Sequence, residues 1–284
     1  MKKLYIMIIV IVLVSCSSNE SNKIVNEGTS LKNYKIIYLG DQGFIHYFNE
    51  SQAIESMRTG PGFNDFVFYN FEYQNNLMSK FEYLNGLGNL LQSYNFNYDS
   101  NGKLTSLVYK KDTFEYTRTF TYTNNSISSV IPDDNSDDTY KITFLLNEKG
   151  LVNELTKINL SNNENEALVK FTYDNNDNCT FIYSKIDYGF GAIEKNLNIQ
   201  YSNKNNPLKS HYTSSYIAYF AIYGDFNILQ EDIISLIVNF GNNTVTKSPE
   251  FNFEYIYNSS GYPVSAEVFD TATGNKSRSI EYNY

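Results

Sequence analysis

The chain has 284 residues, a formal net charge of −9, and 20 Phe and 26 Tyr residues but no Trp. Without its first 15 residues it keeps 20 Lys and Arg residues against 31 Asp and Glu residues, a charge of −11. This acidity argues against nucleic acid and anionic lipid surfaces as partners, because both require a basic protein face. The length allows one large β domain or two small ones, and the aromatic content fits strands with one buried face.

The N-terminus has the organisation of a secretory signal peptide. Lys2 and Lys3 precede an apolar run, residues 4–14, that is too short to span a bilayer as a helix, which takes about 20 residues. The run ends in Leu13-Val14-Ser15-Cys16, which resembles the lipobox of bacterial lipoproteins. The resemblance implies cleavage before Cys16, acylation of that residue and attachment to a membrane through the lipid. An ordinary signal peptide with an incidental Cys, or an uncleaved anchor, is the alternative.

We therefore expect a signal peptide over residues 1–15, a flexible polar tether over 16–30 and a single domain over 31–284. Ser17 follows the Cys, and the resemblance then favours the outer membrane, with the periplasmic face or the cell surface left open. Cys179 is the thiol that remains after lipidation, so no disulfide framework is available.

A β-hairpin unit repeats along the rest of the chain. After an initial hairpin around Gly40–Gly43, the clearest copy is FNYDSNGKLTSLVY, residues 96–109. Asp99 suits the first position of a type I turn, and Gly102 suits the positive φ of a G1 bulge. Simple alternation then places the following residues on one face: Phe96, Tyr98, Leu104, Ser106 and Val108.

The same register can be applied to seven hairpins, each with an aromatic or apolar residue before the turn and an apolar residue opposite it. The expected pairs are Tyr73 with Met78, Tyr98 with Leu104, Tyr122 with Ile127, Leu146 with Val152, Tyr173 with Cys179, Tyr201 with Pro207, and Tyr257 with Pro263. Asn75-Asn76 and Asn124-Asn125 suit two-residue turns with left-handed residues.

One segment departs from the repeat. Residues 213–233 carry apolar positions spaced for one or two short helices, and we expect a helix there that plugs or caps the sheet. Residues 235–240 favour a return to strand, and residues 279–284 favour a final strand. The predicted fold class is therefore all-β, with repeated antiparallel hairpins in one curled, barrel-like sheet and a short helical insertion.

The hairpin resembles the YD-repeat motif of secreted β-shell proteins, in which Tyr-Asp-x-x-Gly-Arg-Leu recurs; Lys103 stands at the Arg position. The order of motifs resembles an uncharacterised group of Bacteroidota lipoproteins that share a domain of unknown function with a porin-like fold. Those motifs are Cys16, the hairpins, Asn206-Pro207, the helical segment, Tyr257–Pro263 and Tyr282–Tyr284. The resemblance implies a barrel-like antiparallel sheet and carries over no functional residue beyond Cys16.

No catalytic or cofactor constellation emerges from the sequence. Residues 133–138 have calcium-loop spacing but lack the Gly and Glu that such a loop needs, so a solvated loop tip is the better interpretation. Cys179 takes a core position in its hairpin and is expected to be an inert buried thiol. His46 and His211 have no zinc-site or triad context. Glu254 and Glu267 could meet across strands.

We therefore expect an outer-membrane-anchored lipoprotein that is not an enzyme, has no cofactor or metal, and serves a structural or ligand-binding role. Glycan and peptide are both candidate ligands, because the polar positions of the sheet are rich in Asn, Thr, Ser and Tyr. A secreted or periplasmic hydrolase with an unrecognised site is one alternative. A membrane-spanning β-barrel, which also alternates apolar and polar residues, is the other.

Overall fold

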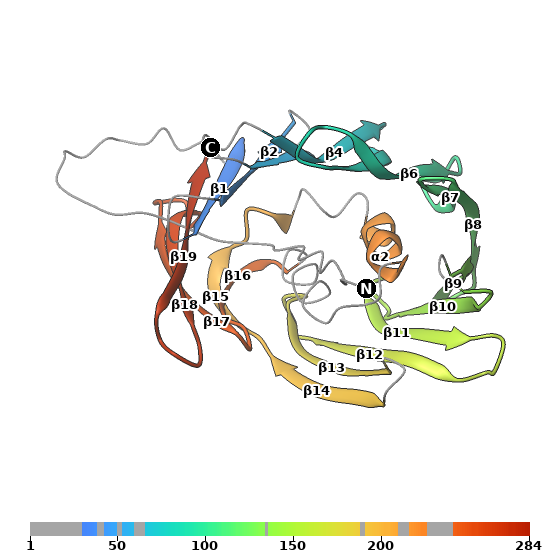
Figure 1. The fold of residues 1–284 in the computed structure, drawn as a ribbon. Coiled ribbons are helices and arrows are strands. Elements are labelled where there is room, and N and C mark those ends of the chain that lie inside the picture. The colour runs from blue at the N-terminus through green and yellow to red at the C-terminus, as the bar shows by residue number, and fades with distance from the viewer. Residues whose placement is uncertain are drawn as a thin grey trace.

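The structure is a computed structural model that describes residues 30–38, 43–49, 53–59, 66–133, 136–187, 191–209, 216–225 and 241–284. The predicted signal peptide, Cys16 and the tether up to residue 29 lie outside the described residues, as do residues 235–240. The described strands form one antiparallel sheet that curls into a nearly closed barrel around helix α2, Tyr216–Asp225 (Figure 1). The predicted fold class is confirmed.

The strands of the first half are β1 (Asn33–Tyr38), β2 (Gly43–Phe48), β3 (Ile54–Thr59), β4 (Phe66–Gln74), β5 (Leu77–Leu84), β6 (Leu90–Tyr98), β7 (Leu104–Lys111), β8 (Phe114–Tyr122), β9 (Ser126–Pro132) and β10 (Thr139–Leu146). Those of the second half are β11 (Val152–Asn159), β12 (Asn165–Tyr173), β13 (Cys179–Asp187), β14 (Ala192–Asn198), β15 (Gln200–Asn205), β16 (Asn243–Lys247), β17 (Phe251–Tyr257), β18 (Pro263–Asp270) and β19 (Lys276–Asn283).

The sheet is a meander that returns to its starting strand. Successive strands pair along the chain, and β19 closes the ring on β1 with Tyr34 opposite Tyr282. Strands β14 and β15 are separated by Ile199 and act as one bent strand, whose first part pairs with β13 and whose second part pairs with β16. The weakest link is β16 with β17, which share the single register pair Lys247 and Asn252.

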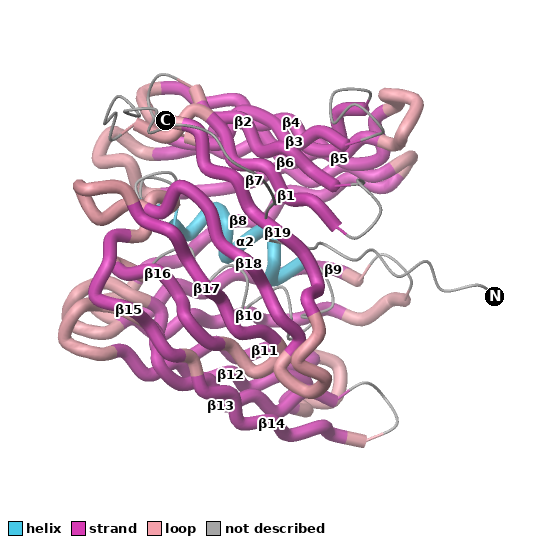
Figure 2. Tube along the Cα trace, turned by 90° about the vertical axis from the view of Figure 1, so that its left-hand side faces the viewer, coloured by secondary structure: helices cyan, strands magenta, loops and turns pink. Residues whose placement is uncertain are grey.

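The barrel has two ends of different character. The turns after Tyr73, Tyr98, Tyr122, Leu146, Tyr173 and Tyr257 lie at one end, which we call the repeat-turn end. The alternate connections lie at the opposite end, among them β5–β6, β7–β8, β9–β10, β11–β12 and β18–β19. The segment that carries α2 leaves β15 and rejoins β16 at the repeat-turn end, and the helix lies within the ring (Figures 1 and 2).

Six of the seven predicted hairpin registers are confirmed, because the predicted residues face each other in the sheet. The seventh is wrong. Tyr201 does not face Pro207 but pairs with Val245 of β16, because β15 runs on to Asn205 and the chain then enters the helical segment instead of turning back.

The predicted faces after the turn need a correction. In the β6–β7 hairpin Tyr98 faces Leu104, but Asn97 faces Ser106, so Thr105 is an extra residue that forms a β-bulge. The bulge shifts the alternation, and Leu107 and Tyr109, not Ser106 and Val108, follow Leu104 into the core. The same irregularity follows the turns after Tyr73, Leu146, Tyr173 and Tyr257. The bulge is therefore part of the repeat.

The turn chemistry agrees with the prediction at most copies. Gly102 has φ +77°, and the Asp99 carboxylate accepts the N–H groups of Asn101 and Lys103 at 2.8 and 2.9 Å. Both bonds lower the pKa of Asp99, and the bond from the Lys103 N–H has the larger effect. The Asn75-Asn76 turn is left-handed as expected, with φ of 53° and 62°. The Asn124-Asn125 turn is not; there the Thr123 and Ser126 hydroxyls meet at 2.7 Å.

At five places a tyrosine hydroxyl ties a strand to the hairpin before it. The phenol of Tyr122 donates to the carbonyl of Leu104 at 2.9 Å, and Leu104 is the residue that faces Tyr98 in the preceding hairpin. We call these contacts tyrosine–carbonyl bonds, and four others follow the same rule: Tyr98 to Met78, Tyr173 to Val152, Tyr201 to Cys179, and Tyr284 to Pro263.

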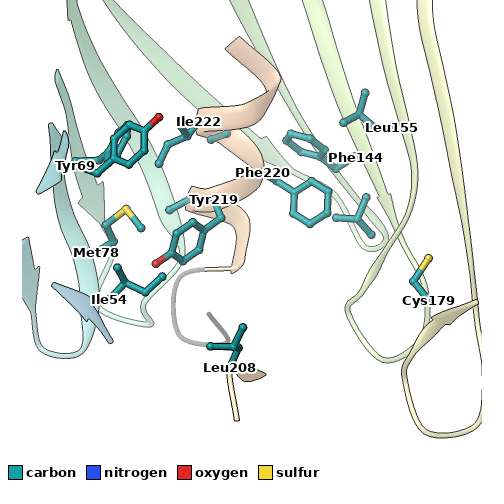
Figure 3. Close-up of a cluster of buried hydrophobic side chains, with 14 of the residues drawn as sticks. Ile54, Tyr69, Met78, Phe144, Leu155, Cys179, Leu208, Tyr219, Phe220 and Ile222 are labelled. Carbon is teal, nitrogen blue, oxygen red and sulfur yellow. The ribbon is translucent and has the colours of Figure 1, made fainter. Parts of the chain in front are cut away.

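Helix α2 confirms the predicted plug. Ala218, Tyr219, Phe220, Ala221 and Ile222 are all buried, and Tyr219 and Phe220 point toward opposite walls of the barrel (Figure 3). The Tyr219 hydroxyl meets that of Tyr73 at 3.1 Å, and the Phe220 ring packs edge-on against Phe144 and Phe171. The helix and the inward strand residues thus form one hydrophobic core.

The buried guanidinium of Arg118 joins this helix to the sheet. It is 0% exposed, and it donates to the Ala221 carbonyl at 3.1 Å and to the Ser129 hydroxyl at 2.8 Å. Its carbon lies 5.0 Å from the Phe120 ring centre. Arg118 therefore fixes α2 against β8 and β9.

Candidate ligand-binding site

The outward face of the sheet is charged. Lys and Glu residues that alternate with core residues face each other across neighbouring strands and form ion pairs around the ring. The outward pairs between strands are Lys35–Glu281, Lys80–Glu72, Lys110–Glu115, Lys170–Glu154, Lys185–Glu194 and Lys276–Glu267, at 2.6 to 3.9 Å. Lys80 also pairs with Glu82 within β5, at 2.6 Å. Each exposed pair adds little stability, but together they give the outer wall a surface suited to water.

Half-buried aromatic rings line the inner face near the opposite end. We call this set the aromatic belt: Tyr38, Phe44, Phe68, Tyr83, Phe114, Tyr116 and Phe251. Each residue lies within three positions of a strand terminus at that end. Neighbouring rings form a row, with centres 6.2 Å apart from Tyr38 to Phe44, 6.2 Å from Phe44 to Phe68, and 6.4 Å from Phe68 to Tyr83.

Phe68 reaches this row because of a bulge. Met57 faces Tyr69 and Arg58 faces Val67, so Phe68 is the extra residue of β4 and its ring contacts inward Phe44.

A guanidinium stands at one end of the row. Arg278 is 7% exposed and faces Tyr38 across β19 and β1. Its guanidinium carbon lies 3.9 Å from the centre of the Phe251 ring and 5.9 Å from that of Tyr38, in cation–π contact with both. Burial lowers the pKa of Arg278, against the opposing attraction of Tyr38 and Glu250. Burial also raises the pKa of Tyr38.

Three polar atoms at this corner are buried without a hydrogen-bond partner in the described part of the chain: Arg278 Nε, Tyr38 Oη and Thr271 Oγ1. Thr271 belongs to the corner because its N–H donates to the carbonyl of Glu250, the residue before Phe251. A buried donor left unpaired costs about 1–3 kcal/mol, so the three atoms together mark a place where hydrogen-bonding capacity is concentrated.

A polar cluster lies on another sector of the inner face at the same end. The Lys157 ammonium is 3.9 Å from the centre of the Tyr140 ring and 3.3 Å from the Glu166 carboxylate. Glu166 also accepts from Asn159 at 3.4 Å. Burial, with the charge of Glu166, raises the pKa of Tyr140 to about 12. This end therefore combines aromatic and charged groups on its inner face.

The thiol predicted to be inert is buried. Cys179 is 0% exposed, lies opposite Tyr173, and is placed beside the core in Figure 3. Burial raises the pKa of its thiol to about 12, so the nucleophilic thiolate does not form near neutral pH.

His46, the histidine that the structure describes, is a core residue. His46 is buried and stacks on Tyr34 with ring centres 4.4 Å apart, and burial lowers its pKa to about 3. His211 lies outside the described residues. In the described ranges no group of three or more His, Cys, Asp or Glu residues could hold a metal ion.

The carboxylates singled out in the sequence do not form a cleft. Glu254 and Glu267 face each other across β17 and β18 as expected, but on the outward face, where Lys276 pairs with Glu267 at 2.8 Å. In the acidic segment 133–138, residues 134 and 135 lie outside the described residues, and the Asp133 N–H donates to the Asp138 carbonyl as at the base of a loop.

No described helix has the length and apolarity needed to cross a membrane.

Arg118 and Arg278 are the functional candidates that the sequence interpretation missed. Each occupies an inward position in a strand of alternating core residues: Arg118 between Tyr116 and Phe120, Arg278 before Ile280. A charged residue at a position where the alternation of the strand predicts a core residue is therefore the sequence feature that could have identified them. The aromatic belt could not be assembled from sequence, because its rings come from strands far apart in the chain.

The comparisons with known proteins give structural neighbours alone. No protein-family model and no curated protein matches the sequence. A porin-like protein from Bacteroides uniformis superposes with a TM-score of 0.45 and 13% identity, over 89% of this chain and 97% of that one. A porin-like protein from Bacteroides vulgatus gives 0.42 and 12%, over 90% and 99%.

A third neighbour, the Photorhabdus luminescens Tc holotoxin pore, gives a TM-score of 0.24 and 9% identity, over 86% of this chain and 18% of that one. Similarity at these levels carries no conclusion about function. The barrel-like antiparallel sheet that the family resemblance implies is present in the described residues; the family itself, with its lipobox and YD-repeat parts, stays a prediction.

Proposed function

We propose that the protein is a lipoprotein anchored to the outer membrane through Cys16, and that its barrel stands in water and binds a glycan or peptide without catalysis. The observation that carries the proposal is the distribution of side chains between the two faces: ion pairs outside, aromatic rings and unpaired polar groups inside at the opposite end. Ligand sites combine apolar and aromatic walls with a few convergent polar groups, as this end does.

The charged outer wall weighs against a membrane-spanning barrel. A lipid-facing Lys or Arg at the bilayer midplane costs about 2–4 kcal/mol, and such barrels carry an apolar outer band. Here Lys and Glu pairs interrupt the outward face on strands β1, β4, β5, β7, β8, β11, β12, β13, β14, β18 and β19. The buried helix and its Arg118 contact also fill the space that an aqueous channel would need.

The lipid anchor is tested by metabolic labelling with a palmitate analogue. We expect the wild-type chain to be labelled and recovered with outer membranes, and Cys16→Ala to lose the label. Cys179→Ala is the matched control, because it removes the other cysteine and should leave the label intact. Labelling of Cys16→Ala would refute the anchor.

Ligand binding is tested with the full-length protein in detergent on arrays of glycans and peptides. We expect binding to some members, with the bound glycan recovered at its original chain length. Shortened product would support the hydrolase alternative and overturn the non-catalytic part of the proposal. If the protein binds nothing on either array, the ligand-binding part of the proposal is refuted.

A further inference from the structure

We propose that Arg278 and Tyr38 bind the carboxylate of an acidic sugar, whose ring stacks on the adjacent aromatic belt. This inference rests on the proposed ligand-binding function and gives it a site and a ligand class. The site is the corner at the opposite end of the barrel where Arg278 of β19 faces Tyr38 of β1 and reaches, across β18, the ring of Phe251 at the start of β17.

The chemistry of the corner favours an anion. The guanidinium of Arg278 is more than nine-tenths buried, and among the described residues it forms no ion pair and its Nε has no acceptor. The rings of Phe251 and Tyr38 lie against its carbon at 3.9 and 5.9 Å, and no described residue accepts a hydrogen bond from its Nε. A carboxylate matches the planar edge of a guanidinium with two parallel, charge-assisted hydrogen bonds.

The Tyr38 hydroxyl adds a second donor. It is buried without a partner and faces Arg278 directly across the two strands. A carboxylate oxygen placed between the two residues would satisfy both, and the nearby Thr271 hydroxyl could donate as well. Glu250 is the carboxylate whose attraction reaches Arg278; it is exposed, so an incoming carboxylate would compete with it for the guanidinium.

The aromatic belt favours a sugar over a peptide. Three successive ring contacts, from Tyr38 through Phe44 and Phe68 to Tyr83, lead away from Arg278 along the inner face. The C–H faces of pyranose rings pack on such aromatic faces. An extended peptide would instead need a free strand edge, and here β1 pairs with both β2 and β19, which closes the edge beside Arg278.

The test uses isothermal titration of the full-length protein in detergent with a galacturonic acid trisaccharide and with the neutral galactose trisaccharide. We expect the acidic sugar to bind at least tenfold more tightly. Arg278→Gln should remove that preference, Arg278→Lys should restore it in part, and Tyr38→Phe should weaken acidic-sugar binding several-fold while leaving every ring in place.

Arg58→Gln is the matched control. Arg58 also lies over a tyrosine ring, at 5.1 Å from the centre of Tyr47, and its Nε is also buried without a partner, but it alternates with inward Met57 and so lies on the outward face. We expect no change in sugar binding. Circular dichroism checks that each variant folds, and Tyr38→Phe still decides the question if Arg278→Gln does not.

The outcomes separate this inference from the proposed function. Equal binding of both trisaccharides, or unchanged acidic-sugar binding in Arg278→Gln and Tyr38→Phe, overturns the Arg278 site and leaves ligand binding standing. Tighter binding of an acidic peptide that depends on Arg278 overturns the sugar assignment. Absence of every glycan and peptide ligand overturns the proposed function itself.

Discussion

The tyrosine–carbonyl bonds predict that removing a single hydroxyl from the repeat destabilises the whole barrel. In Tyr201→Phe the ring and its packing stay, but the 2.9 Å bond to the Cys179 carbonyl is lost. In Tyr122→Phe the 2.9 Å bond to Leu104 is lost in the same way. One such hydrogen bond contributes about 1 kcal/mol to the free energy of unfolding. In a domain of this size that lowers Tm by roughly 2–4 °C.

The losses in the free energy of unfolding caused by the two substitutions should add. Strands β8 and β15 are far apart in the sheet, with adjacent strands about 4.8 Å apart, and residues separated by more than about 10 Å usually act independently. We therefore expect the double variant to lose about 2 kcal/mol, measured by urea unfolding followed by circular dichroism.

Tyr262→Phe is the control for this series. Tyr262 lies at the same end and is half-buried, and its hydroxyl makes no hydrogen bond within the described chain. Its loss should change stability by no more than a few tenths of a kcal/mol. Equal losses in Tyr262→Phe and Tyr201→Phe would refute the idea that the hydroxyls hold the hairpins together.

Three further predictions concern single groups. Burial lowers the pKa of His46 to about 3, below its unfolded value near 6.5. The unfolded chain therefore binds the extra proton, and the free energy of unfolding falls as the pH drops. His46→Phe should remove about 3 kcal/mol of the fall between pH 6.5 and 4, as measured by urea unfolding at each pH. Burial raises the pKa of Cys179 to about 12, so a maleimide at pH 8 should label the thiol after denaturation and not before, and rapid native labelling would contradict its core position. Gly102→Ala should cost about 1 kcal/mol through its φ of +77° alone, because the added Cβ would meet Leu77 at an ordinary 3.6 Å, whereas Asn101→Ala should be nearly neutral.

Local chemistry made the hairpins predictable. Turn residues such as Asp99 and Gly102 act within a few positions, and they set the register that places Tyr98 opposite Leu104. The helix was predictable for a related reason, since residues 216–225 break the alternation of the strands. These features depend on neighbours in sequence, and the prediction succeeded there.

Features that depend on contacts between distant strands were not predictable. Thr105 looks like an ordinary alternating residue, and the bulge that it forms moves Leu107 into the core, which inverts the predicted face. Tyr201 has the sequence of another hairpin, but its strand continues because Val245 arrives from the far side of the helical segment. The pairing of Arg278 with Tyr38 requires the two ends of the chain to meet.

The arrangement of the repeat bears on where a ligand can bind. The five tyrosine–carbonyl bonds, and the bulges that follow the turns after Tyr73, Tyr98, Leu146, Tyr173 and Tyr257, belong to the repeat-turn end, so that end is cross-linked between hairpins. The opposite end has no described counterpart of these bonds, and it holds the aromatic belt and the unpaired donors of Arg278 and Tyr38. Polar groups stay buried and unpaired where a function compensates the free-energy cost of leaving them unpaired. A barrel that is cross-linked at one end and keeps unpaired donors at the other is therefore what we expect of a scaffold that presents a binding site.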